Sequence, residues 1–290
     1  MNNSADSSRS PLYSPWLYFV VTFAWTWFFW GLGILLQVSM ESAGGFVLLL
    51  LGVLGPMLTG IGFTYLTRDR AGRRDYWARV VDVRRIGLKW FLVILLFTPI
   101  LNVLAALLDI LFGGQGAVWG PSIVNVVSNP VSLVFSALFA TLIPFIEELG
   151  WRGYVLDRLQ ETKSALTSSL ILNVVWSLWH LPMFFIPDSY QAGLGVGTPE
   201  FWLFIVGVVP LGFAFTWIYN NTRRSILAVI LFHSMVNFTG ELIAISERAD
   251  TFATLLWFVV AIGITVLGGA KTFTRQPHGH RHTPPARQRL

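Results

Sequence analysis

The chain has 290 residues, of which 54% are hydrophobic and only 12% are charged. Soluble domains carry about 25% charged residues, so this composition excludes an ordinary soluble domain and predicts an all-α polytopic membrane protein. The sequence has no cysteine, which excludes disulfides, thiolate metal sites and a cysteine nucleophile. The net charge of +5 does not indicate nucleic-acid binding, because its distribution along the chain fits a membrane topology.

Eight segments are long and apolar enough to span a membrane, which takes about 20 residues in a helix. The predicted helices are 16–36, 45–65, 90–112, 131–156, 165–186, 201–219, 226–245 and 252–269. Together they form one transmembrane domain, 16–270. A polar N-terminal tail, 1–15, and a basic C-terminal tail, 271–290, flank it, and we expect both to be disordered.

The basic residues are divided very unequally between the two sides of these eight helices. If the N-terminus is cytoplasmic, 19 of the 20 Lys and Arg residues fall on the cytoplasmic side, and Arg248 is the exception. Because positively charged loops stay in the cytoplasm, both termini are predicted to be cytoplasmic. In a prokaryote the membrane would be the plasma membrane.

The basic stretch 68–89 contains Tyr76 and Trp77 and precedes the third predicted helix. It could lie on anionic lipid as an interfacial segment. A solvated cytoplasmic loop that follows the positive-inside rule is the favoured interpretation.

A few ionisable side chains lie inside the predicted helices, where each costs roughly 2.5–3.5 kcal/mol and usually marks function. The ionisable residues are Glu147, Glu148 and Arg152 on the fourth predicted helix, His180 on the fifth and His233 on the seventh. Asn173 and Trp176 lie near His180 in the sequence, and Asn237 lies near His233. Three different helices therefore contribute candidate site residues.

Helix geometry assigns these residues to faces. Glu148 and Arg152 are four residues apart, so they share a face and are predicted to form a structural ion pair. Glu147 lies about 100° around the helix and stays free for chemistry. His233 and Asn237 are also four apart and project from one face.

The fourth and fifth predicted helices are expected to form an antiparallel hairpin. The midpoint between Glu147 and His180 falls at Lys163 and Ser164, inside a polar run that is typical of a turn. Glu147 and His180 then end at a similar depth, provided that the fourth helix continues to about Gln160.

A glutamate beside histidines in a low-dielectric cavity can activate water as a general base. A histidine and an asparagine can stabilise an oxyanion by hydrogen bonding. Glu147, His180 and His233 could instead bind a divalent metal such as zinc, with an open position for water. The residues alone leave both mechanisms open.

Structural roles compete with these assignments. The two histidines could be interhelical hydrogen-bond partners. Asp109 and Glu241 lie near predicted helix ends and are interpreted as structural. Trp16, Trp25, Trp27 and Trp30 are typical of lipid-facing or interfacial packing.

Three motifs occur in a fixed order on separate predicted helices. They are Glu147-Glu148-x-x-x-Arg152, Trp176-x-x-x-His180 and His233-x-x-x-Asn237. The set resembles the CPBP family of CAAX-prenyl-endopeptidase and bacteriocin-processing intramembrane proteases, also called the Abi family. The matching region, 131–238, is the expected catalytic core.

The resemblance implies an eight-helix fold and endopeptidase activity, which in eukaryotic members removes the last three residues of prenylated CAAX proteins. It implies that Glu147 and His180 activate the attacking water. His233 and Asn237 would then form the oxyanion site. The family is described as metalloproteases, and a metal-free glutamate mechanism has also been argued, so zinc dependence stays open.

Further implications concern support and partners. The resemblance implies that Glu148 and Arg152 support the geometry of the site. Trp176 stands where the family usually has Phe, and we expect an altered pocket shape with activity retained. The implied partners are a peptide or protein substrate, prenylated or not, and membrane lipids.

Two other classes of function compete with the peptidase. A non-catalytic immunity or scaffold protein could retain the motifs. A small transporter could use the polar residues as a proton relay, but it should show inverted repeats or pairs of broken helices, and no clear case is present in the sequence.

Overall fold

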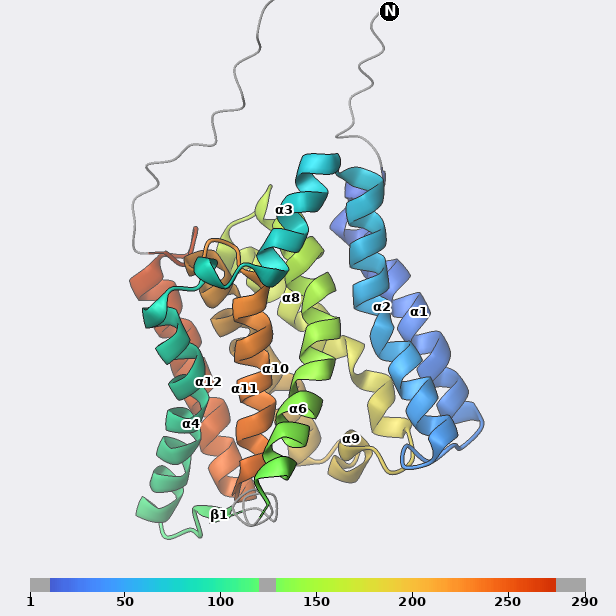
Figure 1. The fold of residues 1–290 in the computed structure, drawn as a ribbon. Helices are drawn as coiled ribbons and strands as arrows, with labels where there is room; N and C mark the ends of the chain where they lie inside the picture. Colours follow the sequence, from blue (N-terminus) through green and yellow to red (C-terminus); the bar gives the residue numbers. More distant parts are fainter. Residues whose placement is uncertain (1–10, 120–128, 275–290) are drawn as a thin grey trace, which may run out of the picture.

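The computed structural model describes residues 11–119 and 129–274. Long α-helices run side by side and form a bundle (Figure 1). They are α1 (Pro15–Leu35), α2 (Ala43–Thr67), α4 (Leu88–Leu111), α6 (Pro130–Gly150), α8 (Ala165–Trp179), α10 (Pro199–Asn221), α11 (Ile226–Leu242) and α12 (Glu247–Gly268). The shorter helices are α3 (Arg70–Val81), α7 (Leu156–Gln160) and α9 (Tyr190–Leu194).

Seven helical segments of the described chain are long and apolar enough to cross a membrane. The remaining predicted span, 226–245, corresponds to α11, an apolar helix of 17 residues. Large apolar side chains cover the outer faces of the bundle, as Leu107 on α4 and Val259 on α12 illustrate, with exposed fractions of 54% and 64%. Such surfaces are stable against lipid rather than water. The prediction of an all-α polytopic membrane protein is confirmed.

The fourth predicted helix occupies the middle of the bundle as α6 and its continuation. It packs against α2 on one side and α11 on the other, and α11 also packs against α4. Glycines permit the close approach of α2, because a Cβ atom on Gly60 would lie 2.7 Å from the Cα atom of Gly150. The motif-bearing helix is thus enclosed by protein along its polar part.

The two ends of the bundle differ (Figure 1). Helix α3 lies across one end, where α1 begins and α12 ends. At the other end, β1 (Ala117–Trp119) pairs antiparallel with β2 (Ile243–Ile245), and Ala117 is opposite Ile245. The strand pair shortens the seventh predicted helix, which ends at Leu242. The cytoplasmic location of both termini stays a prediction.

The favoured interpretation of 68–89 as a solvated loop is wrong. Asp69 caps α3 by accepting a hydrogen bond from the Gly72 amide at 2.8 Å. The helix then buries Tyr76, Arg79 and Val80 against the bundle. The basic residues masked this role, because a mostly charged helix can be held by a few buried side chains instead of an apolar stripe.

Both predicted tails contain packed residues next to the bundle. Phe273 is fully buried, and the Asn221 side chain donates to its carbonyl at 2.8 Å. At the other terminus, Pro11–Tyr13 forms a 3-10 turn, η2, and the Tyr154 hydroxyl donates to the Leu12 carbonyl at 2.6 Å. The remaining tail residues, 1–10 and 275–290, lie outside the described chain.

Two further side chains have structural roles. Asp109 at the end of α4 accepts from Arg248 and from the Ser246 hydroxyl, which explains the one basic residue on the opposite side. Trp30 is 1% exposed and donates to the Leu49 carbonyl, so its assignment to lipid-facing packing is wrong. Trp16 has the expected exposure, at 55%.

Candidate functional site

The helix that carries the first motif changes its winding directly after the two glutamates. Helix α6 ends at Gly150, a π-helical turn, η4, spans Trp151–Val155, and α7 continues to Gln160. The π register is visible in the Leu156 amide, which donates to the Trp151 carbonyl five residues earlier. π-Turns inside α-helices occur frequently at functional sites. The predicted extension of this helix to Gln160 is confirmed.

The predicted hairpin between the fourth and fifth helices is also present. Ser164 caps α8 by accepting from the Thr167 amide at 3.1 Å, so the turn falls where the polar run predicts it. The α-helix then ends at Trp179, earlier than expected, and His180 is its C-cap. Leu181–Phe185 continues as a 3-10 helix, η5, with Pro182 near its start. His180 therefore lies where the backbone changes from α-helical to 3-10 winding.

Glu147 is 3% exposed and bonds to a side chain of the neighbouring helix. The indole Nε1 of Trp176 donates to Glu147 Oε2 at 2.7 Å. A hydrogen bond to an ionised carboxylate is stronger than one between neutral groups. Trp176 therefore fixes one oxygen of the carboxylate and sets the direction of the other.

Glu148 belongs to a separate, fully buried charge cluster. Its two oxygens lie 2.9 and 3.1 Å from Arg152 Nη1, so the ion pair predicted from the spacing is present. Oε1 also lies 3.0 Å from His233 Nδ1 on α11. The guanidinium group reaches Asn173 Oδ1 at 3.4 Å. The cluster joins α6, α8 and α11 around charges that balance one another, as burial requires.

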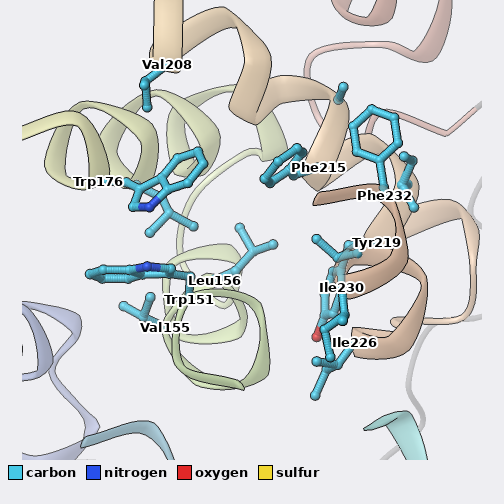
Figure 2. Close-up of a cluster of buried hydrophobic side chains, with 14 of the residues drawn as sticks. Trp151, Val155, Leu156, Trp176, Val208, Phe215, Tyr219, Ile226, Ile230 and Phe232 are labelled. Carbon is cyan, nitrogen blue, oxygen red and sulfur yellow. The ribbon is translucent and has the colours of Figure 1, made fainter. Parts of the chain in front are cut away.

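Arg152 is also enclosed by aromatic rings. Its guanidinium carbon lies 5.2 Å from the centre of the Trp176 ring and 4.6 Å from that of Phe215. Cation–π contacts of this kind stabilise a desolvated arginine. Figure 2 shows Trp176 and Phe215 next to each other, with Trp151 and Leu156 below them. The polar cluster thus sits among the packed apolar side chains of the core.

Trp176 connects the three candidate catalytic groups. Besides its bond to Glu147, its ring centre lies 5.6 Å from the His180 ring and 5.4 Å from the His233 ring. The second motif supplies this tryptophan, for which the sequence predicted only an effect on the shape of the pocket. Asn237 lies one turn beyond His233 on α11 and is partly buried. The structure therefore brings Glu147, His180 and His233 around one indole, with Asn237 on the adjoining turn.

The hydrogen bonds fix where each imidazole carries its proton. His180 Nδ1 lies 2.8 Å from the Trp176 carbonyl oxygen, which can only accept. Nδ1 is therefore the protonated nitrogen, and Nε2 of the neutral ring is an acceptor. His233 Nδ1 faces the Glu148 carboxylate and likewise carries a proton. Its Nε2 is therefore an acceptor in the neutral ring and a donor when both ring nitrogens are protonated.

The same side chains do not form a metal-ligand set. In the part of the chain that the structure describes, no three His, Cys, Asp or Glu side chains form a group that could hold a metal ion. Glu147 is held by Trp176, and His233 is turned towards Glu148. In this arrangement the set Glu147, His180 and His233 does not fit zinc, which needs three or four ligands around one point.

Several supporting residues escaped the sequence analysis. The Tyr76 hydroxyl of α3 donates to the Leu149 carbonyl at 2.8 Å, and Arg79 Nη2 donates to the Gly153 carbonyl at 3.3 Å. Both carbonyls lie within or next to the stretch where the helix changes winding. Tyr76 and Arg79 appear in the sequence only as members of a basic segment, so no local signal points to this contact.

A cavity of about 680 Å³ lies between α4, α10, α11 and α12. Its lining includes Phe204, whose ring centre is 5.5 Å from that of His180, and Val236, the neighbour of Asn237. Leu211 and Trp257 are among the apolar lining residues, and the carboxylates Glu200, Glu247 and Asp250 also line the cavity. The cavity therefore adjoins the candidate site and can hold an apolar ligand.

The fold and the site define a polytopic membrane protein with a carboxylate and two imidazoles in its interior. The family model of Rce1-like type II CAAX prenyl endopeptidases matches residues 90–239. CAAX prenyl protease 2 of Methanococcus maripaludis is 32% identical over 257 residues, which cover 87% of this chain and 93% of that protein. The chain belongs to the Rce1-like type II CAAX prenyl endopeptidase family and is a multi-pass membrane peptidase.

Proposed function

We propose that this peptidase cleaves a peptide bond near the C-terminus of a prenylated, CAAX-like protein. The observation that carries the proposal is the placement of Glu147, His180 and His233 around Trp176 in the bundle interior. The name of the archaeal relative supports the substrate class. The cavity next to His180 is the proposed place for the apolar part of the substrate, which would pack against its apolar lining residues.

The proposed reaction begins with a water molecule between Glu147 and His180. Water donates one hydrogen bond to the Glu147 carboxylate and the other to His180 Nε2, the acceptor nitrogen of the neutral ring. Its oxygen attacks the carbonyl carbon of the peptide while Glu147 takes the proton. His180 orients the water and Glu147 is the base.

The tetrahedral intermediate then needs donors for its negatively charged oxygen. Protonated His233 donates from Nε2, and the amide of Asn237 donates from the next turn of α11. Glu148 orients the ring by accepting from His233 Nδ1 at 3.0 Å. When the C–N bond breaks, Glu147 returns its proton to the leaving amine. The proposed catalytic core is the region 131–238.

The first experiment is cleavage of a quenched fluorescent prenylated CAAX peptide by purified protein in detergent. Wild type is compared with Glu147→Gln, and Glu241→Gln is the matched control because Glu241 is exposed at the end of α11. Cleavage by wild type and the control, with at least about a thousandfold loss in Glu147→Gln, supports the proposal. A chelator arm tests the requirement for a metal.

Other outcomes contradict parts of the proposal. Equal cleavage by Glu147→Gln and wild type excludes Glu147 as the base. Cleavage of an unprenylated membrane peptide in preference to the prenylated one replaces the substrate class. If wild type cleaves neither, the non-catalytic scaffold is the better interpretation, and the phenotype of a strain carrying Glu147→Gln decides it.

A further inference from the structure

A second cavity, of about 660 Å³, opens at the end of the bundle that α3 covers. It is separate from the candidate active site and lies between α3, α7, the end of α10 and the segment after α12. We call it the α3-end cavity. Its charged lining residues are Arg68, Asp75, Arg79, Asp157, Glu161, Lys163, Arg224 and Lys271.

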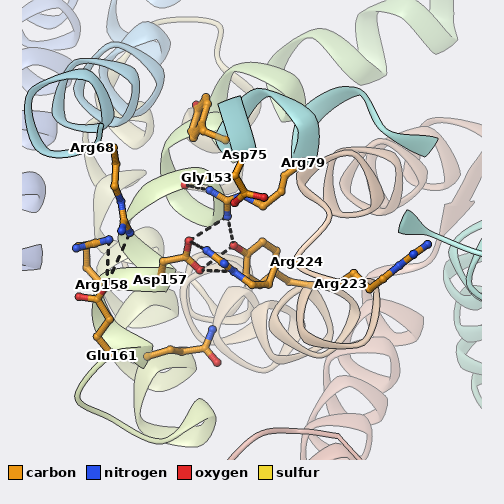
Figure 3. Close-up of polar contacts among 12 residues, drawn as sticks. Arg68, Asp75, Arg79, Gly153, Asp157, Arg158, Glu161, Arg223 and Arg224 are labelled. Atoms are coloured by element: carbon orange, nitrogen blue, oxygen red, sulfur yellow. Dashed lines mark hydrogen bonds and ion pairs between the residues drawn. The ribbon is translucent and has the colours of Figure 1, made fainter. Parts of the chain in front are cut away.

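The floor of the α3-end cavity is an ion-pair network that is already internally balanced. Asp157, which is partly buried, pairs with Arg79 at 2.9 Å and with Arg224, as the dashed lines in Figure 3 show. The Tyr219 hydroxyl donates to the same carboxylate at 2.8 Å. Arg79 also contacts Asp75 at 3.2 Å. This network fixes the shape of the cavity and leaves little charge for a ligand.

The rim of the cavity carries an excess of positive charge. Glu161 is shared between Arg68 and Arg158, at 3.7 and 2.9 Å. Lys163 and Lys271 also line the cavity, and both are exposed. Within the described residues, neither lysine has a carboxylate within ion-pair distance. Five basic and three acidic side chains therefore line the cavity, and the two free lysines account for the surplus.

Aromatic residues at the same end of the bundle indicate the depth of the membrane interface. The Trp77 indole on α3 donates to the hydroxyl of Tyr65, near the end of α2, and Tyr65 is 44% exposed. Trp90 lies in the first turn of α4, beside Lys89 at 5.5 Å. Trp and Tyr concentrate at the level of lipid headgroups. The α3-end cavity therefore lies where headgroup phosphates are.

We propose that the α3-end cavity binds the phosphate of an anionic phospholipid headgroup, with Lys163 and Lys271 as its cationic ligands. Lysine is a point charge with three donors and suits a phosphate that approaches from solvent or lipid. Juxtamembrane lysines contribute to binding of anionic lipids in the same way. A bound headgroup would link the turn between α7 and α8, which carries Lys163, to the segment after α12. These two segments are already close, because the Ala165 amide at the start of α8 donates to the Lys271 carbonyl.

The test measures lipid binding by the full protein in detergent. Native mass spectrometry counts phosphatidylglycerol or phosphatidylcholine molecules bound per chain, and thermal unfolding gives the midpoint as each lipid, or inorganic phosphate, is added. The variant is Lys163→Gln with Lys271→Gln. The charge-matched control is Arg70→Gln with Arg74→Gln, because these exposed residues of α3 do not line the cavity.

We expect phosphatidylglycerol to bind and stabilise wild type and the control, and to bind the lysine variant about tenfold more weakly. Equal binding to all three proteins would overturn the proposal, as would equal binding of phosphatidylcholine. An effect of inorganic phosphate that equals the lipid's and disappears in the lysine variant would overturn the assignment to lipid. Unfolding midpoints without added ligand separate a folding defect from lost binding.

Discussion

Trp176 donates its indole proton to Glu147 across 2.7 Å, and this bond links the first and second motifs between α6 and α8. The bond depends on the indole, because a phenylalanine at this position has no donor. A carboxylate proposed as a base must be held towards the attacked atom, and the tryptophan provides that orientation. Trp176 therefore contributes a hydrogen-bond donor to the candidate site as well as its aromatic ring.

We expect Trp176→Phe to lower kcat about tenfold. A hydrogen bond to a charged group is worth roughly 1.5–3 kcal/mol, and the aromatic ring that remains keeps part of the packing around Glu147. Peptide cleavage by the purified variant measures the change. Trp202→Phe is the control, since Trp202 is 56% exposed on α10. An unchanged kcat in Trp176→Phe would show that the indole bond does not position Glu147.

Arg152→Leu is expected to destabilise the protein by about 3–5 kcal/mol, because it leaves the buried Glu148 charge without its main partner. Thermal unfolding in detergent measures the loss. Combining it with Glu148→Gln should recover much of the stability, since the double variant buries neither of the two charges. A double variant that is as unstable as the single one would contradict this account.

Gly150→Ala is expected to prevent normal packing of α2 against α6. A Cβ atom at this position would lie 2.1 Å from the Pro56 carbonyl oxygen and 2.3 Å from the Tyr18 hydroxyl. Overpacking typically costs about 1–3 kcal/mol, and more where backbone must move. Gly62→Ala is the control, because a Cβ there meets nothing within 4 Å. A normal unfolding midpoint for Gly150→Ala would contradict the close approach of these helices.

Tyr76→Phe removes the hydrogen bond from α3 to the Leu149 carbonyl, and we expect a loss of about 1–2 kcal/mol. Tyr190→Phe, at an exposed tyrosine of α9, is the control for the stability measurement only, because Tyr190 also lines the cavity proposed for the substrate. If α3 positions the winding change after the glutamates, kcat should fall while KM stays constant. A variant that is less stable but fully active would limit α3 to a structural role.

The Tyr76 bond also predicts a pH dependence. Burial raises the pKa of Tyr76, so the folded protein favours the protonated hydroxyl. Its contribution to stability is complete below the ordinary tyrosine pKa of about 10 and is lost as the pH rises through the raised pKa. Wild type should therefore lose stability more steeply above about pH 10 than Tyr76→Phe does. Parallel unfolding curves for the two proteins would contradict this prediction.

Much of the fold follows from local patterns in the sequence. Runs of about 20 apolar residues located the spans, and the polar run at Ser164 located the hairpin turn. The four-residue spacing predicted the pairing of Glu148 with Arg152. These features depend on neighbours in the chain, and periodicity is sufficient to predict them.

Other features depend on contacts between distant segments. The π-turn at Trp151–Val155 has no signal that we can identify in the sequence. The bond between Glu148 and His233 joins residues 85 positions apart, and that between Trp176 and Glu147 joins residues 29 apart. Helix α3 looked like a loop because its buried contacts are made by Tyr76 and Arg79 instead of an apolar stripe.

The sequence by itself determined that the protein lies in a membrane, that its helices carry three sets of polar residues, and which residues of one helix share a face. Helical periodicity and the cost of charge in lipid act locally, so they can be read along the chain. Only the tertiary structure decided which side chain each charged group meets. That choice follows from how the helices pack, because a buried polar group must find its partner on whichever neighbour packing brings within about 3 Å.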